Sequence, residues 1–267
     1  MTAFALQDVT CSFASNTSKG LYTATQGVNL QVGQGEFVSV VGPTGCGKST
    51  LLNVAAGLLA PSAGRVEVFG QPLAGINQRA GYMFQGDSLM PWKTAQDNVM
   101  AGLLFRGVDE KTARAESQAW LKRVGLGAFG SRYPHQMSGG MRKRVMLAQT
   151  LIRDPDIILM DEPFSALDIQ TRHLMENELL ELWGQKKKAV LFITHDLDEA
   201  IALSDRVVVL SAGPASHPIG EFVVDLPRPR DVMEVRGQAA FVALHNQIWS
   251  ALREEVLKGY AQQMGAL

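Results

Sequence analysis

Residues 42–49 read Gly42-Pro43-Thr44-Gly45-Cys46-Gly47-Lys48-Ser49, and this stretch decides the fold. It matches the phosphate-loop pattern, in which glycines, a lysine and a serine stand at fixed offsets. The glycines let backbone N–H groups point at a phosphate, Lys48 reaches the terminal phosphates, and the Ser49 hydroxyl is a ligand for Mg²⁺. The sequence therefore predicts a nucleotide site that comprises Gly42, Pro43, Thr44, Gly45, Cys46, Gly47, Lys48, Ser49 and Thr50.

The flanks of this loop predict a strand before it and a helix after it. Residues 37–41 are apolar without alternation, which is typical of a strand covered on both faces. Residues 48–59 are apolar on nearly all sides and predict a buried helix, which Pro61 and Gly64 end. The phosphate-loop pattern thus has the strand and the helix that it requires on either side.

Downstream, strands alternate with helices. Strands are expected at residues 156–160, 189–193 and 206–210, and Asp168 and Asp196 are placed to cap the helices between them. This alternation predicts βαβ units and a mostly parallel sheet.

The middle and the two ends have other patterns. From about Asp87 to Thr150 the periodicity is helical, with Asp109 capping a helix to Val124 and Ser138 capping another through Leu151. The first 35 residues predict strands and turns, with alternation around Phe4, Leu6 and residues 28–32. An amphipathic helix is expected from about 238 to 257, with one apolar stripe that contains Phe241, Leu244, Ile248 and Leu252.

Composition narrows the function classes. The 267 residues include 25 Lys+Arg and 26 Asp+Glu, so the chain lacks the basic excess of a general nucleic-acid binder. No stretch reaches about 18 apolar residues, and any membrane role is therefore expected to act through a partner. Cys11 and Cys46 have no disulfide-framework spacing, which favours a reducing compartment.

Two acidic residues follow the apolar run at 157–160. Asp161 is placed to hold Mg²⁺, and Glu162 is placed to polarise an attacking water, although strand ends commonly carry acids for structural reasons. His195 follows the expected strand at 189–193, at the edge of a parallel sheet where ligands bind. A lone histidine after a strand is more often a loop residue, so its role depends on this placement.

Cys46 lies in the loop at a helix N-terminus, a position that lowers the pKa of a thiol. The residue is either a redox sensor or a small side chain that fits the loop, and the second interpretation is favoured. Alkylation of Cys46 is expected to block nucleotide binding, and bound ATP is expected to protect the thiol.

Six motifs together resemble the ABC (ATP-binding-cassette) transporter ATPases in type, order and spacing. They are the phosphate loop, Gln85, Ser138-Gly139-Gly140, Asp161-Glu162, Ser165-Ala166-Leu167-Asp168 and His195. The resemblance implies an α/β fold with a P-loop NTPase (RecA-like) core, a small antiparallel β-subdomain and an inserted α-helical subdomain. It places the cassette at residues 4–230, the helical subdomain at about 87–152 and a C-terminal helical extension at 231–267.

The resemblance also implies roles for individual residues. Phe13 resembles the aromatic that stacks on adenine, with Tyr22 as the less favoured candidate. Gln85 resembles the glutamine that joins Mg²⁺ and the water to the helical subdomain, and His195 resembles the switch histidine at the γ-phosphate. Across a dimer, the opposite ATP site would be completed by Ser138, Gly139, Gly140 and Asp168. The cofactors implied are ATP and Mg²⁺, with Glu162, His195, Lys48 and Gln85 as the catalytic set.

Finer features resemble one branch of the family, the nitrate, sulfonate and taurine importers. Bicarbonate and pyrimidine-precursor importers share these features. These features are Met141, residues 89–92, residues 161–168 and residues 225–230. The branch implies an ATP-hydrolysing subunit that drives import of a small solute. Its partners would be integral membrane permease subunits, a second copy or paralogue, and, indirectly, an external solute-binding protein. It would lie peripherally on the cytoplasmic face of the inner membrane, with no nucleic acid partner.

The sequence also bears on three functions other than that of an importer subunit. A soluble ABC-type ATPase that acts on ribosomes or DNA is the main alternative, but the chain has one cassette and no sustained heptads between its phosphate-loop and acidic motifs. A small GTPase would need an Asn-Lys-x-Asp motif, which the sequence lacks. A regulator that binds ATP without turnover is disfavoured by the presence of both Glu162 and His195. The basic runs at 142–144 and 186–188 are interpreted as solvated helix faces or ends.

Overall fold

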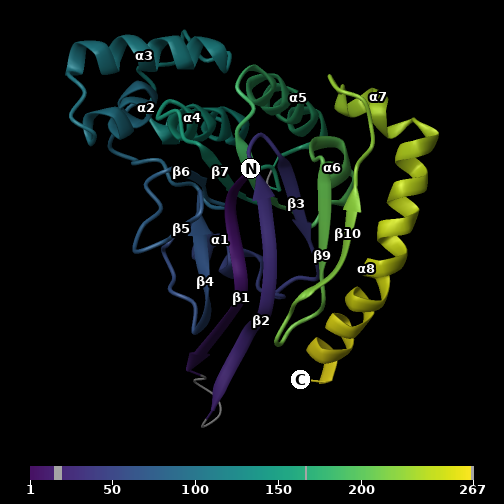
Figure 1. Cartoon of the computed structure of the whole chain (residues 1–267). Helices are drawn as coiled ribbons and strands as arrows, with labels where there is room; N and C mark the ends of the chain where they lie inside the picture. Colours follow the sequence, from purple (N-terminus) through teal and green to yellow (C-terminus); the bar gives the residue numbers. More distant parts are fainter. Residues whose placement is uncertain (15–19, 166, 266–267) are drawn as a thin grey trace.

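The computed structural model describes residues 1–14, 20–165 and 167–265. Two sheets form the framework (Figure 1). One sheet is antiparallel with the strand order β2-β1-β4-β5, and the other has the order β10-β9-β3-β8-β7-β6. The predicted parallel sheet is confirmed, because β3 pairs in parallel with β8 and β9, and β7 pairs in parallel with β6 and β8.

The central strands of the larger sheet are buried on both faces. Every residue of three of them is buried, namely β3 (Phe37–Val41), β7 (Ile157–Asp161) and β8 (Ala189–Ile193). The sheet is completed by β6 (Ala80–Met83), β9 (Arg206–Leu210) and β10 (Pro218–Val223), of which only β10 runs antiparallel to its neighbour. Unbroken apolar runs without alternation are what this double burial requires.

Alternate residues of each strand enter different cores. In β7, Ile157 and Leu159 pack toward α1 (Lys48–Ala55) and the antiparallel sheet, whereas Ile158 and Met160 face the opposite side. That opposite side is covered by α5 (Ile169–Gln185), α6 (Leu197–Leu203) and helices of the middle segment. The expected caps Asp168 and Asp196 accept hydrogen bonds from Thr171 N and Glu199 N at the starts of α5 and α6.

Long strands make up most of the antiparallel sheet. They are β1 (Thr2–Ala14) and β2 (Leu21–Gly33), followed by β4 (Ala63–Val68) and the short β5 (Gln71–Pro72). Figure 1 shows β1 and β2 in front of the larger sheet, with α1 behind them. The sheet covers α1 and buries its apolar residues against the strands of the core.

Helices occupy the chain between β6 and β7, as the sequence predicts. They are α2 (Ala95–Leu104), α3 (Glu110–Arg123), the short η1 (Pro134–Gln136) and α4 (Gly139–Leu151). The expected caps are confirmed: Asp109 accepts from Thr112 N, and Ser138 accepts from Met141 N. In Figure 1 these helices lie together on one side of the molecule, beyond β6.

The structure corrects the end of the helix after the phosphate loop. Helix α1 ends at Ala55, not at Leu59, because Gly57 adopts a left-handed φ of 69°. A Cβ at Gly57 would lie 1.9 Å from the carbonyl oxygen of Gly75, so only glycine fits this turn. The stop signal is therefore Gly57 and not Pro61.

The C-terminal region is more helical than expected. Within the helical extension expected at 231–267, α7 (Val232–Arg236) is a separate short helix that was not individually predicted, and α8 runs from Ala239 to Gly265, beyond the expected end at about 257. The predicted apolar stripe of α8 is confirmed, since Phe241, Ile248 and Leu252 are buried in the core. Across the described part of the chain, the helices include none with the length and apolarity that a bilayer crossing needs.

Candidate functional site

The phosphate loop connects β3 to α1. Lys48 is 7% exposed, and its Nζ donates to the carbonyl oxygens of Gly42 (2.8 Å) and Pro43 (2.9 Å). Gly47 has a φ of 93°, and a Cβ there would lie 2.6 Å from Thr25 Cγ2. The loop thus curls around the lysine, which holds the ammonium group at the start of α1, where helix N–H groups favour an anion.

Ser49 and Asp161 meet at the carboxyl edge of the sheet. Ser49 Oγ donates to Asp161 Oδ1 at 3.1 Å, and Asp161 is 7% exposed. Burial raises the pKa of Asp161, an effect that the hydrogen bond from Ser49 and the charge of Lys48 partly oppose. A hydroxyl and a carboxylate are hard oxygen ligands, so these two residues fit a Mg²⁺ ion.

Glu162, Gln85 and His195 converge on one carboxylate. Gln85 Nε2 donates to Glu162 Oε2 at 3.0 Å, and His195 Nδ1 lies 3.2 Å from the same oxygen. Glu162 has a left-handed φ of 42°, and its N–H donates to Ile193 O. This uncommon backbone conformation of a non-glycine residue fixes the direction of the side chain, and such strain concentrates at functional sites.

The Gln85 segment is attached to helix α4 by two basic side chains. Lys143 Nζ donates to the carbonyl oxygen of Gln85 at 2.6 Å, and Arg142 Nε lies 2.7 Å from Asp87 Oδ2. Lys143 is 7% exposed, and burial lowers its pKa. The interpretation of residues 142–144 as a solvated face is therefore wrong for Lys143, because its side chain is buried against the carbonyl oxygen of Gln85. The sequence around Lys143 does not indicate this contact, since the two residues are 58 positions apart.

The Ser138 and Asp168 motifs form a second group of residues. Ser138, Gly139, Gly140 and Asp168 line one hollow of about 400 Å³, together with Leu167 and Thr171. Ser138 caps α4, so helix N–H groups point into this region. Ala166 of the same motif lies outside the described residues. No phosphate-loop residue lines this hollow, so within the described chain the two predicted half-sites are separate.

The two aromatic candidates for adenine stacking are cross-strand partners. Phe13 of β1 is paired with Tyr22 of β2, and they are 38% and 44% exposed. Directly opposite residues of antiparallel strands share a face of the sheet. A Cβ added at Gly213 would lie 3.7 Å from Tyr22 Oη and 3.5 Å from Gly45 O. Both aromatics are therefore exposed on one face, and the Tyr22 hydroxyl lies close to Gly213, beside the phosphate loop.

Cys46 differs from the sequence expectation. Its side chain is 1% exposed, and burial raises the pKa of its thiol, although the charge of Lys48 opposes that effect. The expectation of a lowered thiol pKa from the helix N-terminus is wrong, because desolvation outweighs it. Cys46 is thus a small buried side chain, which agrees with the favoured interpretation.

The apolar residues after Gln85 are divided between core and surface. Leu89 is buried in the core, whereas Trp92 is 73% exposed. From the sequence, these residues could equally line a groove for a partner helix or fill the core of the helical subdomain. Leu89 belongs to the core, and Trp92 remains as a surface residue that a partner can contact.

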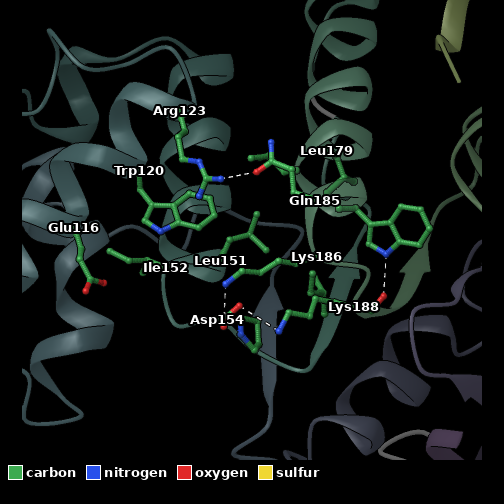
Figure 2. A pocket seen from close by; sticks show the side chains of 14 residues that line it. Glu116, Trp120, Arg123, Leu151, Ile152, Asp154, Leu179, Gln185, Lys186 and Lys188 are labelled. Atoms are coloured by element: carbon green, nitrogen blue, oxygen red, sulfur yellow. Dashed lines mark hydrogen bonds and ion pairs between the residues drawn. The ribbon is translucent and has the colours of Figure 1, made fainter. Parts of the chain in front are cut away.

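A cleft of about 450 Å³ lies away from these residues, between α3, the end of α4 and the end of α5. Figure 2 shows how charged side chains span it: Arg123 donates to Gln185 Oε1 at 2.5 Å, and Lys186 and Lys188 both contact Asp154. No predicted site residue lines this cleft. The cleft lies where the middle helices contact the sheet core, away from the predicted nucleotide site.

Comparisons with known proteins place the chain in a family. The family profile described as "ABC transporter" matches residues 25–165. An uncharacterised ABC transporter ATP-binding protein of Methanocaldococcus jannaschii is 47% identical over 236 residues, which cover 88% of this chain and 86% of that protein. An aliphatic sulfonates import ATP-binding protein of Bacillus cereus is 39% identical over 227 residues, which cover 85% of this chain and 88% of that protein.

A solved structure is similar in fold. It is a dimeric ATP-binding cassette in a post-hydrolysis state, bound to ADP and Pi. The similarity has a TM-score of 0.74 at 30% identity and covers 84% of this chain and 100% of that one. The predicted P-loop NTPase fold is thereby confirmed.

Proposed function

This chain belongs to the ABC transporter family as an ATP-binding subunit with ATPase activity, and we propose that it drives an importer for a small solute such as a sulfonate, nitrate or taurine. The observation that carries the catalytic part is the convergence of Gln85 and His195 on Glu162, one residue after Asp161. Three polar side chains from separate loops meet there beside the phosphate loop.

Each of these residues has a role in the proposed hydrolysis. Glu162 orients and polarises the attacking water, and Gln85 and His195 hold the carboxylate in place. Lys48 and the loop N–H groups bind the β- and γ-phosphates. Ser49, Asp161 and Gln85 would hold Mg²⁺, which supplies charge neutralisation at the phosphates. Phe13 is proposed to stack on the adenine.

A second copy of the chain, or a paralogue, is proposed to complete each ATP site. Ser138, Gly139 and Gly140 of one chain would face the phosphate loop of the other, and Asp168 would contact the opposite chain. Support comes from the separation of the two half-sites within one chain and from the dimeric cassette of similar fold. The γ-phosphate then favours the closed dimer, and hydrolysis releases it.

Motion is proposed to reach membrane permease subunits through the helical subdomain at about 87–152. Lys143 and Arg142 join the Gln85 segment to α4, which supports this route. Exposed Trp92 is the proposed permease contact. The chain would lie peripherally at the cytoplasmic face of the inner membrane, with an external solute-binding protein as an indirect partner.

The solute class rests on the sequence branch and on the sulfonate-import relative. No residue of this chain is expected to touch the solute, because a permease and an external binding protein select it. The proposal therefore names a class of small solutes and not one compound.

The test is affinity purification of the chain from its native cells in mild detergent, followed by mass spectrometry. The expected result is recovery of a multi-span membrane protein, with a solute-binding protein encoded or purified beside it. Trp92→Ser should reduce that recovery, whereas Trp249→Ser, a matched change at an exposed tryptophan of α8, should not. Recovery of ribosomes or DNA-repair proteins without a membrane partner would contradict the importer and favour the soluble alternative.

A further inference from the structure

The last turns of helix α8 lie against the phosphate loop. A Cβ at Gly259 would lie 3.4 Å from Pro43 Cβ, and Pro43 is buried. Figure 1 shows α8 running along the outer edge of the larger sheet, beside β10, toward the end of the chain. A helix distant in sequence from residues 42–49 is therefore one of their neighbours.

Glu255 anchors this helix beside the loop. It is 7% exposed, and its Oε2 accepts a hydrogen bond from Ala212 N at 2.7 Å. Its other oxygen pairs with Lys258 Nζ at 2.5 Å. Burial raises the pKa of Glu255, but the hydrogen bonds from Lys258 and Ala212 outweigh it and hold the pKa below its ordinary value. Both carboxylate oxygens of Glu255 therefore have partners, one on the 211–217 connection and one on α8 itself.

The segment that Glu255 holds is in turn packed on the phosphate loop. Residues 211–217 connect β9 to β10, and Ser211 and His217 close this connection by hydrogen bonds of 2.9 Å and 3.1 Å. Ser216 Oγ donates to Cys46 O. The Cβ position of Gly213 lies 3.5 Å from Gly45 O. The phosphate loop is therefore hydrogen-bonded to this connection at Cys46 and lies close to it at Gly45.

We propose that Glu255 is a positioning residue for the phosphate loop, acting through Ala212 and the 211–217 connection and through the contact of α8 with Pro43. A phosphate loop binds through the directions of its N–H groups, so a support that fixes its backbone lowers the cost of binding. Cys46 O and Gly45 O belong to the peptides whose orientation sets these directions. The inference rests on the proposed role of residues 42–50 in ATP binding, and it assigns a function to the C-terminal helix.

The test measures the dissociation constant of the full chain for a fluorescent N-methylanthraniloyl-ATP in the presence of Mg²⁺. Glu255→Ala removes the acceptor of Ala212 N and should weaken binding about tenfold, the value of one hydrogen bond to a charged group. Glu255→Gln keeps an acceptor oxygen and should restore most of the affinity. Glu254→Ala, at the exposed neighbouring position, should leave the affinity unchanged.

A second pair of variants tests the other contact, that of α8 with Pro43, without removing a charge. Gly259→Ala places a Cβ at ordinary contact distance from Pro43 and should bind as the wild type does. Gly259→Leu forces a larger side chain against Pro43 and should weaken binding several-fold. This pair applies even where Glu255→Ala does not fold, which thermal unfolding without nucleotide would reveal.

Two results overturn the proposal. One is an unchanged nucleotide affinity in folded Glu255→Ala, and the other is equal affinity in Gly259→Leu and Gly259→Ala. Failure of the proposed ATP site itself would look different, since wild type and Lys48→Ala would then bind the nucleotide equally.

Discussion

Arg172 Nη1 lies 3.1 Å from Asp196 Oδ2, and the same guanidinium donates through Nη2 to the carbonyl oxygen of Leu167. Leu167 precedes Asp168, and Asp196 follows His195. One side chain in the first turn of α5 therefore joins the segment proposed to contact a second chain to the segment that carries the histidine. The carboxylate and guanidinium are partly buried, at 31% and 21% exposed, which limits screening by solvent.

Loss of this connection should lower turnover more than nucleotide affinity. Arg172→Ala frees Asp196 and the adjacent His195 from the Asp168 segment, so we expect ATPase turnover to fall about tenfold with the ATP dissociation constant within about twofold. The measurement is steady-state ATPase activity together with ATP binding on the same preparation. Arg114→Ala, which removes an exposed pair with Glu110, is the matched control. Equal turnover in both variants would remove Arg172 from this role.

Replacement of the proposed base should separate binding from hydrolysis. Glu162→Gln keeps the size and an acceptor oxygen for Gln85 but removes the carboxylate that polarises water. We expect ATP binding to persist, turnover to fall at least about a hundredfold, and an ATP-bound dimer to accumulate. Turnover and mass by light scattering with Mg-ATP check this. Glu181→Gln, at an exposed position of α5, is the control, and wild-type turnover in Glu162→Gln would exclude Glu162 as the base.

Residues that act through local patterns were predictable from sequence. The caps Asp109, Ser138 and Asp168 are found at the expected helix starts, since each cap needs only a side-chain oxygen before a helical stretch. The buried strands were equally clear, because apolar runs without alternation indicate burial on both faces. The residues that determine each of these caps and strands lie within or next to the element itself, so the local sequence is enough to predict them.

Contacts between distant segments were not predictable. Lys143 donates to Gln85 O. Arg230, which the sequence indicates only as part of the branch feature at 225–230, is 9% exposed and donates to the carbonyl oxygens of Ile201, Ala202 and Ser204 at the end of α6. A basic residue in sequence is ordinarily solvated, and only the fold reveals which carbonyls it contacts. The end of α1 was mispredicted for a similar reason, since the close approach of Gly57 to Gly75 O joins two segments.

The buried state of Cys46 predicts slow thiol chemistry. Because burial raises the thiol pKa and leaves 1% of the residue exposed, alkylation by iodoacetamide at pH 7 should be many-fold slower than that of a free thiol. Mg-ATP should slow it further, and the alkylated protein should not bind ATP. Mass spectrometry of Cys46 against time follows the reaction, with Cys46→Ala as the control that retains ATP binding. Rapid alkylation that ATP does not affect would contradict the buried placement.

The free energy of unfolding should depend on pH through Glu199, a buried carboxyl group close to the loop of His195. Glu199 is 3% exposed, accepts a hydrogen bond from the Thr194 hydroxyl, and has its pKa raised by burial to about 8 from an ordinary 4.5. Thr194 Oγ1 in turn accepts from Asp196 N at 3.0 Å. Glu199 therefore supports the loop on which His195 is carried.

The direction of the effect follows from proton counting. Between pH 4.5 and about 8 the folded protein keeps a proton on Glu199 that the unfolded chain has lost, so the free energy of unfolding falls as pH rises, by at most about 1.4 kcal/mol per pH unit. Glu176, whose pKa burial raises to about 7, adds to this fall over the lower part of the range. Glu199→Gln keeps an acceptor for Thr194 and does not ionise. Between pH 5 and pH 8 the free energy of unfolding of this variant should rise, relative to that of the wild type, by on the order of 1–3 kcal/mol. Urea unfolding at both pH values measures this change. Glu181→Gln should show no such gain, and an identical pH dependence in wild type and Glu199→Gln would mean that Glu199 is ionised in the folded protein.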